Sequence, residues 1–331
     1  MTFTGAFQRV LRGLEMVKKY ARFVKPMPVK MGPEGLYPDM RIWMESKDFE
    51  GLNAHFSYGF FRKAGIVCHP IKSDEALVHP YDELLVFAGI DTSDITKMHG
   101  EISIEIGENP EEYVFNEPTV VVIPKGTPHG PIKVNSLEQP IMHYLVGLGP
   151  EYKAMSIPKK AKSTEKKYAH LIKKFRSSIQ TLSQYREMPG FVDERGVMYP
   201  SKFVGPGNAD QLLWIYGYDL EGVETNISWG FYSKCGIWHR MPGGGAHVHP
   251  VDEALIFVGL DPNNLYYLGA QVEFDLGDEL ERHLINVPTA VIAPRGLVHC
   301  PEITWWVDKP YGFIVFCLGI EHETHWLPFS I

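Results

Sequence analysis

The chain has 331 residues, of which 44% are hydrophobic and 12% aromatic, enough for two domains with large buried cores. Its formal net charge of −8 argues against a nucleic-acid-binding protein that works by neutralising phosphates. No apolar run reaches the roughly 18 residues of a membrane span, and no basic start followed by an apolar run predicts a signal peptide. The four cysteines form no C-x-x-C pair and are typical of reduced thiols. We therefore expect a cytoplasmic protein without nucleic-acid or membrane partners.

Residues 4–21 have a helical period, with Phe7, Val10, Leu11 and Leu14 on one face. This pattern predicts an N-terminal helix that packs on its own chain or on a partner, in preference to a membrane-surface helix. Prolines and glycines between positions 26 and 38 then predict an irregular entry.

From about residue 41 the pattern becomes one of short strands separated by turn residues. The strands that we expect in the first half are 56–60, 84–88, 102–106, 120–123 and 142–148. Many short strands with Gly, Pro, Asn and Asp between them predict an all-β barrel or sandwich.

The segment from 158 to 185 interrupts this pattern. Ser163 or Thr164 can cap a helix whose apolar face runs from Tyr168 to Leu182. Its many lysines indicate a solvated outer face, although a basic helix could also bind an acidic partner. Pro189 ends the segment, so we expect an inter-domain helix between two β domains.

The second half of the chain repeats the first at a constant spacing. His79 and His249 are 170 residues apart (249 minus 79), and the same spacing joins Glu83 to Glu253 and His129 to His299. The register holds without a gap from residue 76 to residue 149. A repeat of this length is a whole domain. We predict a first domain over 1–158, a helical linker over 159–190 and a second domain over 191–331.

The second half carries a cluster of metal-ligating residue types. His247 and His249 alternate along a strand and point to one face, and a tight turn after Pro250 can return Glu253 over them. His299 is a fourth candidate. Neutral imidazoles and a carboxylate from adjacent strands form a site for a divalent metal.

These residues resemble the two sequence motifs of the cupin superfamily. His247, His249 and Glu253 match the three ligand positions of the first motif, and Pro294, Gly296 and His299 match the P-x-G-x2-H core of the second. With the internal repeat, the chain resembles a bicupin. The resemblance implies two double-stranded β-helix (jelly-roll) barrels, with three histidines and one glutamate on a metal in the second.

The first half retains only part of this ligand set. Leu77 stands at the position of His247, whereas His79, Glu83 and His129 remain. A three-ligand site there stays open, because catalytic metals often keep free positions. His143 and His69 are candidate substitutes, although each also fits a structural histidine.

Other residues near the second motif are candidates for a substrate pocket. We assign His239, Arg240, Trp229 and Phe231 to it, with Arg240 able to hold a carboxylate. The pair His322 and His325 follows the last expected strand, and we interpret it as an exposed tail or a dimer contact.

The function that we expect is that of a metal-dependent enzyme acting on a small organic substrate. One divalent metal per chain (Fe, Mn or Ni, with Zn as a further option) would serve a dioxygenase, which we place first because the metal-binding cupins that the chain resembles frequently catalyse such reactions in aromatic pockets. The alternatives are a metal-dependent decarboxylase, lyase or isomerase, and a non-enzymatic small-molecule-binding cupin. The amphipathic segments and the aromatic tail at 326–329 predict a homodimer.

Overall fold

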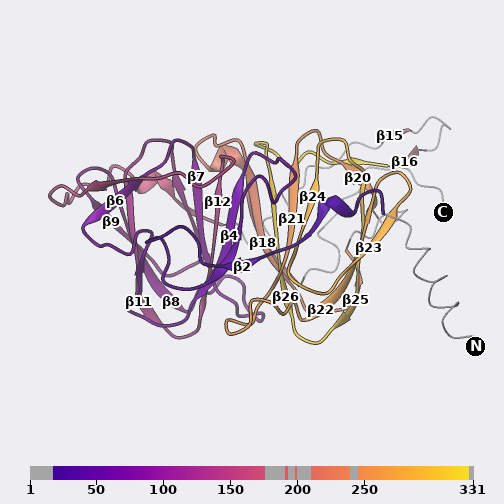
Figure 1. Ribbon diagram of the computed structural model, residues 1–331, viewed down its shortest axis with the longest axis horizontal. Coiled ribbons are helices and arrows are strands. Elements are labelled where there is room, and N and C mark those ends of the chain that lie inside the picture. The colour runs from indigo at the N-terminus through magenta and orange to yellow at the C-terminus, as the bar shows by residue number, and fades with distance from the viewer. Residues whose placement is uncertain (1–17, 176–190, 193–197, 200–209, 239–244, 328–331) are drawn as a thin grey trace, which may run out of the picture.

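The computed structural model describes residues 18–175, 191–192, 198–199, 210–238 and 245–327, and their regular secondary structure is almost entirely β-strand. They form two barrels side by side, each built from two facing sheets (Figure 1). The all-β, two-barrel jelly-roll fold predicted from the sequence is confirmed. Among the described residues, no helix has the length and apolar character that crossing a membrane requires.

The first barrel pairs a seven-stranded sheet, ordered β14-β10-β7-β12-β4-β3-β2, with a sheet ordered β13-β6-β11-β8-β9, in which β5 also pairs with β11. Its strands are β2 (Val29–Lys30), β3 (Arg41–Met44), β4 (His55–Phe61), β5 (Val67–Cys68), β6 (Glu75–Val78), β7 (Glu83–Ala88), β8 (Gly100–Ile106), β9 (Glu111–Phe115), β10 (Thr119–Ile123), β11 (His129–Leu137), β12 (Ile141–Gly147), β13 (Met155–Pro158) and β14 (Ile172–Lys174). All five strands expected in this half are present.

The second barrel repeats this plan, with sheets ordered β1-β24-β21-β26-β18-β17 and β23-β22-β25-β20-β27, and with β19 also on β25. Its strands are β1 (Val24–Pro26), β17 (Gln211–Ile215), β18 (Asn226–Tyr232), β19 (Gly236–Ile237), β20 (His247–Val248), β21 (Glu253–Gly259), β22 (Ala270–Leu276), β23 (Glu281–Ile285), β24 (Thr289–Ala293), β25 (His299–Val307), β26 (Tyr311–Cys317) and β27 (His325–Trp326). A separate hairpin joins β15 (Phe191–Val192) to β16 (Met198–Tyr199).

The barrels meet through one sheet of each, and this contact explains why their central strands are buried along their whole length. Every residue of β4, β12, β18 and β26 is buried, because one face lines a barrel and the other faces the neighbouring barrel. The rings of Phe56 and Phe316 stack across the interface with their centres 6.1 Å apart, and the ring of Phe56 also lies 6.0 Å from that of Tyr144. Tyr58 donates a hydrogen bond to the carbonyl oxygen of Gly259 at 2.9 Å. The two barrels therefore share a core.

Two short segments, residues 20–26 and 168–174, occupy equivalent places on the two barrels, and we call them the first and the second arm. In the first arm, β1 pairs with β24, with Val24 opposite Val291. In the second, β14 pairs with β10, with Ile172 opposite Val121, the residue 170 positions before Val291 (291 minus 121). The first arm thus precedes the first barrel in sequence but adds its strand to the second (Figure 1).

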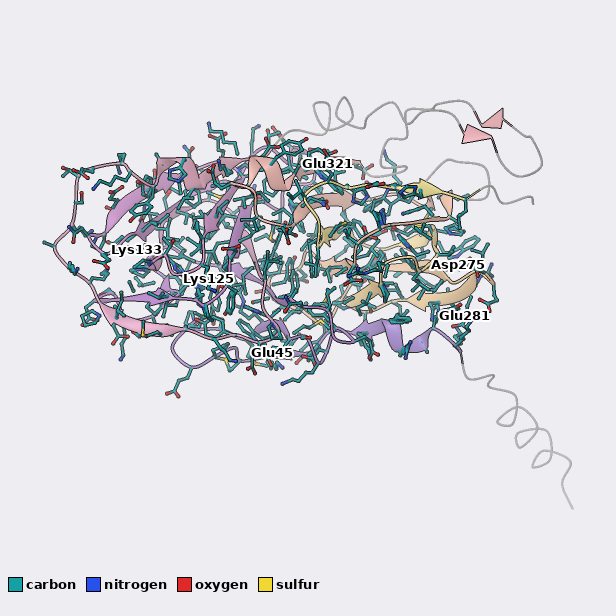
Figure 2. All side chains as sticks on the ribbon, turned by 90° about the horizontal axis from the view of Figure 1, so that it is seen from above. Glu45, Lys125, Lys133, Asp275, Glu281 and Glu321 are labelled. Atoms are coloured by element: carbon teal, nitrogen blue, oxygen red, sulfur yellow. The ribbon has the colours of Figure 1, made fainter. Side chains whose placement is uncertain are left out.

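The side chains at the start of each arm repeat the same contacts. The backbone N–H of Tyr20 donates to Glu281 at 3.0 Å, and that of Tyr168 donates to Glu111 at 3.4 Å. Viewed from above, Glu281 lies beside the first arm at the far end of the second barrel (Figure 2). The matching contacts identify the arms as a further repeated element, which the 170-residue register did not reveal.

The structure corrects the expectation of an inter-domain helix wherever it describes that segment. Residues 163–175 contain a single 3-10 turn, η2 (Ala169–Leu171), followed by β14. Pairing with the edge of β10 overrides the helical period, since a strand that completes a sheet satisfies its backbone there. Residues 176–190 and most of the expected N-terminal helix, 1–17, lie outside the described residues. The domain limits at 158 and 190 stay a prediction.

Candidate metal centres

The four predicted ligands of the second barrel come from the ends of three neighbouring strands. His247 begins β20 and lies opposite His299, the first residue of β25. His249 follows β20, and Glu253 begins β21 after the turn at Pro250. All four are buried, with 4% or less of each residue exposed. The turn expected from the sequence therefore brings the carboxylate back to the imidazoles.

Most of the distances within this group suit one small cation. Glu253 Oε2 lies 3.3 Å from His249 Nε2 and 3.1 Å from His299 Nε2. Donor atoms of His247, His249 and His299 all lie within 4.8 Å of one another. Ligands bound at about 2.0–2.2 Å at right angles or tetrahedral angles are roughly 3.0–3.5 Å apart. Glu253, His249 and His299 are thus spaced like ligands around a shared ion, and His247 groups with the two other histidines but not with Glu253.

Hydrogen bonds on the far side of each ring fix which nitrogen faces the cluster. Nδ1 of His247 donates to the carbonyl oxygen of Gly245 at 2.6 Å, and Nδ1 of His249 to that of Glu323 at 2.6 Å. His299 Nδ1 donates to the carbonyl oxygen of Leu297 at 3.0 Å. Because a carbonyl only accepts, each Nδ1 holds the proton and each Nε2 offers a lone pair.

Those inward-facing atoms are short of hydrogen-bond partners. His249 Nε2, His299 Nε2 and Glu253 Oε2 are buried without one in the described structure. Burial would raise the pKa of Glu253, but the neighbouring His249 and His299 hold it well below its usual range, so the carboxylate is ionised. Buried lone pairs around an anionic oxygen fit a divalent metal ion, which would supply the missing charge.

Two further side chains, Cys317 and His322, lie against this group. The Cys317 thiol donates to Glu253 Oε1 at 3.4 Å, and His322 Nδ1 lies 3.2 Å from the same sulfur. His322 also forms a ligand-competent group with His249 and Glu253. The interpretation of His322 as part of an exposed tail is therefore wrong, whereas His325 is exposed and pairs with Glu323 at 2.8 Å. The strand β27 folds this segment back onto β20.

Two of the four predicted pocket residues face the wrong side of their strand. The ring of Trp229 lies against Tyr58 of the first barrel at 6.4 Å, and Phe231 packs on Trp229 at 5.2 Å. These contacts place both residues in the inter-barrel core. The prediction was wrong because neighbouring residues of a strand point to opposite faces, so an error of one residue reverses the side. Tyr232, the next residue, stacks on Tyr311 at 5.2 Å inside the barrel. His239 and Arg240 lie outside the described residues.

The interior of the second barrel also contains a carboxyl group, Glu302, that sequence reasoning missed. It is fully buried on β25, where neither of its oxygens makes a hydrogen bond of good geometry in the described structure, although the Tyr311 hydroxyl lies close enough to lower its pKa. Burial raises its pKa well above the usual range, which favours the protonated form of the group. The Thr304 and Tyr311 hydroxyls, 2.7 Å apart, are further polar groups of this interior.

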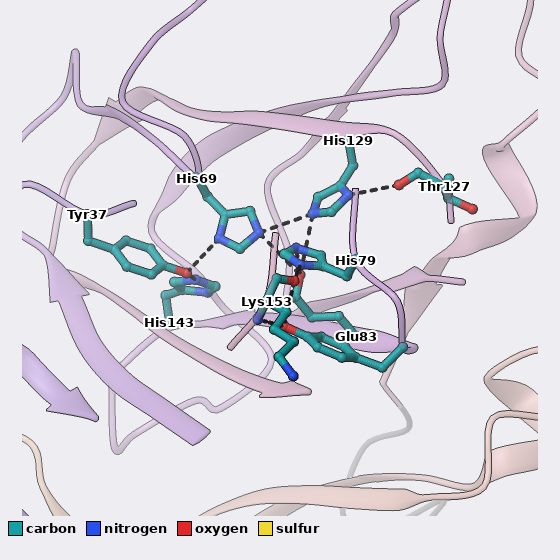
Figure 3. Close-up of polar contacts among 9 residues, drawn as sticks. Tyr37, His69, His79, Glu83, Thr127, His129, His143 and Lys153 are labelled. Carbon is teal, nitrogen blue, oxygen red and sulfur yellow. Dashed lines mark hydrogen bonds and ion pairs between the residues drawn. The ribbon is translucent and has the colours of Figure 1, made fainter. Parts of the chain in front are cut away.

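The first barrel holds four donors, one more than the three predicted there. His69 joins His79, Glu83 and His129 in a group whose donor atoms all lie within 4.8 Å of one another (Figure 3). Glu83 Oε2 lies 3.2 Å from His69 Nε2, 3.5 Å from His79 Nε2 and 3.4 Å from His129 Nε2. His69, one of the two candidate substitutes named from the sequence, thus lies where it can supply the donor that Leu77 lacks.

The outer hydrogen bonds of the second barrel recur here at the same repeat positions. Nδ1 of His79 donates to the carbonyl oxygen of Lys153 at 2.7 Å, and Nδ1 of His129 to that of Thr127 at 3.0 Å. His143, the other candidate substitute, does not join the donor group. Its Nε2 instead contacts the Tyr37 hydroxyl at 2.7 Å.

Comparison with solved structures gives the fold a precedent. The chain matches the oxalate decarboxylase of Bacillus subtilis at pH 4.6 with a TM-score of 0.53 and 12% identity, over 92% of this chain and 78% of that one. It matches the formate complex of Lactobacillus farciminis oxalate decarboxylase with a TM-score of 0.52 and 11% identity, over 92% and 88%. No family model and no curated protein matches the sequence.

Identities this low establish the architecture alone. The chain has the bicupin fold, with a candidate metal-binding group of histidines and a glutamate in each barrel. The resemblance drawn from the sequence motifs is thereby confirmed.

Proposed function

We propose that this protein is a metal-dependent bicupin enzyme that decarboxylates, or otherwise cleaves, a small carboxylic acid. The observation that carries the proposal is the buried group of His247, His249, Glu253 and His299, in a fold shared over 92% of the chain with oxalate decarboxylases. Decarboxylation, the second choice from the sequence, now replaces the dioxygenase as the leading activity. Oxalate is the first substrate to test.

A divalent ion held by these four residues would act as a Lewis acid that binds and polarises a carboxylate. Iron, manganese, nickel and zinc all accept this donor set. The carbonyl oxygens of Gly245, Glu323 and Leu297 keep each imidazole in the tautomer that presents Nε2. The ligands are thus oriented before an ion arrives, which lowers the cost of binding it.

The remaining interior residues suit the loss of carbon dioxide. The stacked rings of Tyr232 and Tyr311 and the Trp238–Phe313 pair, with ring centres 4.1 Å apart, keep bulk water from the barrel. Cleavage of a carbon–carboxylate bond leaves a carbanion that must take up a proton. Glu302, a buried carboxyl group of the same barrel whose raised pKa favours its protonated form, is a candidate to supply that proton.

The test is a turnover assay on protein of known metal content. Manganese- and iron-loaded protein is incubated with oxalate and with a panel of 2-oxo and 3-oxo acids, and carbon dioxide release is measured with and without oxygen. We expect release that does not consume oxygen stoichiometrically and that is lost in His249→Leu. Oxygen uptake in step with substrate loss would support the dioxygenase instead, and metal-loaded protein that turns over none of these acids would refute the proposal.

A further inference from the structure

The first barrel contains a donor, His69, that the sequence motif does not include. In the second barrel His247 lies opposite His299, and in the first Leu77 lies opposite His129 in the same register. Leucine has no donor atom. His69 instead arrives from the end of β5, on the same sheet, and its Nε2 comes within 3.1 Å of His129 Nε2. The missing imidazole is thus replaced from a neighbouring strand.

The backbone at His69 has an unusual conformation that aims the side chain inward. Its φ of +53° lies in the left-handed region, which residues other than glycine rarely adopt. The N–H of His69 donates to the carbonyl oxygen of Leu36 at 2.7 Å and holds the turn in place. A strained, fixed residue whose ring is fully buried is positioned by its surroundings.

A chain of hydrogen bonds determines the proton positions on His69 (Figure 3). His143 Nδ1 donates to the carbonyl oxygen of Val86 at 2.9 Å, so His143 Nε2 is an acceptor. The Tyr37 hydroxyl must therefore donate to His143 Nε2, 2.7 Å away. Having used its proton, the Tyr37 oxygen accepts from His69 Nδ1 at 3.2 Å. This order leaves a lone pair on His69 Nε2.

Three imidazole lone pairs and a carboxylate consequently converge without a proton among them. His79 and His129 present Nε2 for the same reason, because each Nδ1 donates to a carbonyl oxygen. Two acceptor nitrogens 3.1 Å apart, on His69 and His129, repel each other unless a cation lies between them and Glu83. The separation is that of two ligands at right angles on one ion, about 3 Å.

We propose that the first barrel binds a second divalent ion through His69, His79, Glu83 and His129, and that Tyr37 and His143 are positioning residues that keep His69 in the ligating tautomer. All four ligand side chains are 0% exposed. The ring of Tyr81 also stacks on His79 at 5.2 Å. This ion is therefore sealed in the protein and stabilises the barrel, whatever reaction the second barrel performs.

The first experiment counts ions per chain by elemental analysis after loading with Zn²⁺ or Mn²⁺ and gel filtration. We expect two ions in the parent, one in His249→Leu, and none in the double variant His69→Leu, His249→Leu. An ion that survives in the double variant, or a folded His249→Leu protein that binds none, overturns the proposal. Because the readout is metal content, the result does not depend on whether the protein is a decarboxylase.

The second experiment tests the positioning residues with a change that removes one oxygen atom. Tyr37→Phe keeps all four ligands but leaves His69 Nδ1 without its acceptor, so the affinity of the first site should fall about 10–100-fold in competition with a chelator. The matched control is His55→Asn, a buried histidine of the same barrel whose Nδ1 donates to the carbonyl oxygen of Gly149 at 2.9 Å. Its repeat position holds Asn226.

The control should retain both ions with the parent's affinities. The apo forms of both variants are compared by thermal unfolding, so that a change in fold is separated from a change in metal affinity. Unaltered affinity in Tyr37→Phe, or an equal loss in His55→Asn, overturns the positioning role.

Discussion

Replacing Glu302 by isoleucine should make the protein more stable, which is unusual for a fully buried residue. Neither carboxyl oxygen makes a hydrogen bond of good geometry in the described structure, and the nearby Tyr311 hydroxyl offsets only part of the burial, so the group has lost its hydration with little compensation. The first barrel has Ile132 at this repeat position, also fully buried, which shows that the fold accommodates an aliphatic side chain there. Glu302→Ile therefore replaces a buried polar side chain with an aliphatic one, the type of side chain that the first barrel has at this position.

The magnitude has two parts. A buried polar group without a partner costs about 1–3 kcal/mol, and the variant recovers this at any pH. The second part depends on pH, because burial raises the pKa of Glu302 above its ordinary value of 4.5. Below that value both the folded and the unfolded chain are protonated. Above it only the unfolded chain releases the proton, and stability falls by about 1.4 kcal/mol per pH unit until the raised pKa is reached.

Relative to the parent, Glu302→Ile should therefore gain stability as pH rises from about 4.5 towards 7, by about 1.4 kcal/mol per pH unit until the raised pKa is reached, beyond the constant part. Urea unfolding of metal-free protein across this range measures the difference. Glu302→Gln is the control, since it removes the titration but keeps a buried polar group and should recover only the pH-dependent part. Parent and Glu302→Ile curves that stay parallel from pH 4.5 to 7 would refute the reasoning.

Three other predictions concern the second metal centre, the buried carboxyl group of Asp275 and association. His247→Leu should weaken metal binding in the second barrel by about 100-fold or more with little loss of fold, since four-ligand sites gain roughly 3–4 kcal/mol per ligand. Glu253→Gln should also weaken metal binding there. Unchanged metal content in both variants would contradict the assignment. Burial and the neighbouring Glu273 raise the pKa of Asp275 to about 6, so the stability that this group contributes below about pH 4 is lost as pH rises to 6, and Asp275→Asn should remove that slope in thermal unfolding. We also expect a homodimer, and a monomer mass by light scattering at micromolar concentration would contradict it.

The repeat and the strand pattern made most of the fold predictable. Strands such as 84–88 and 120–123 were readable because turn residues bound short apolar runs. The close packing of the four predicted second-barrel donors followed from the period of a strand and one tight turn. Local rules were sufficient wherever neighbouring residues in space are also neighbours in sequence.

His69 was harder to assign because its partnership depends on the pairing of separate strands. It lies eight positions before Leu77 (77 minus 69) and outside the motif spacing. One signal was present, since His69 and His239 are 170 residues apart, the repeat distance. The predicted direction of the Trp229 side chain was wrong for a different reason, because an error of one residue in a strand boundary reverses the direction of every side chain in the strand.

Each arm precedes one barrel in the sequence but adds its strand to the other barrel, so the two barrels depend on each other. β24 is covered on one edge by β1, which lies at the opposite end of the sequence. β10 is covered by β14, which lies beyond the strands of its own barrel. A fragment ending at residue 158 would leave β10 as an open edge and carry β1 with no strand to pair with, while the complementary fragment would expose β24. The halves are therefore not separable modules: produced as two polypeptides, they would tend to aggregate alone and to recombine when mixed.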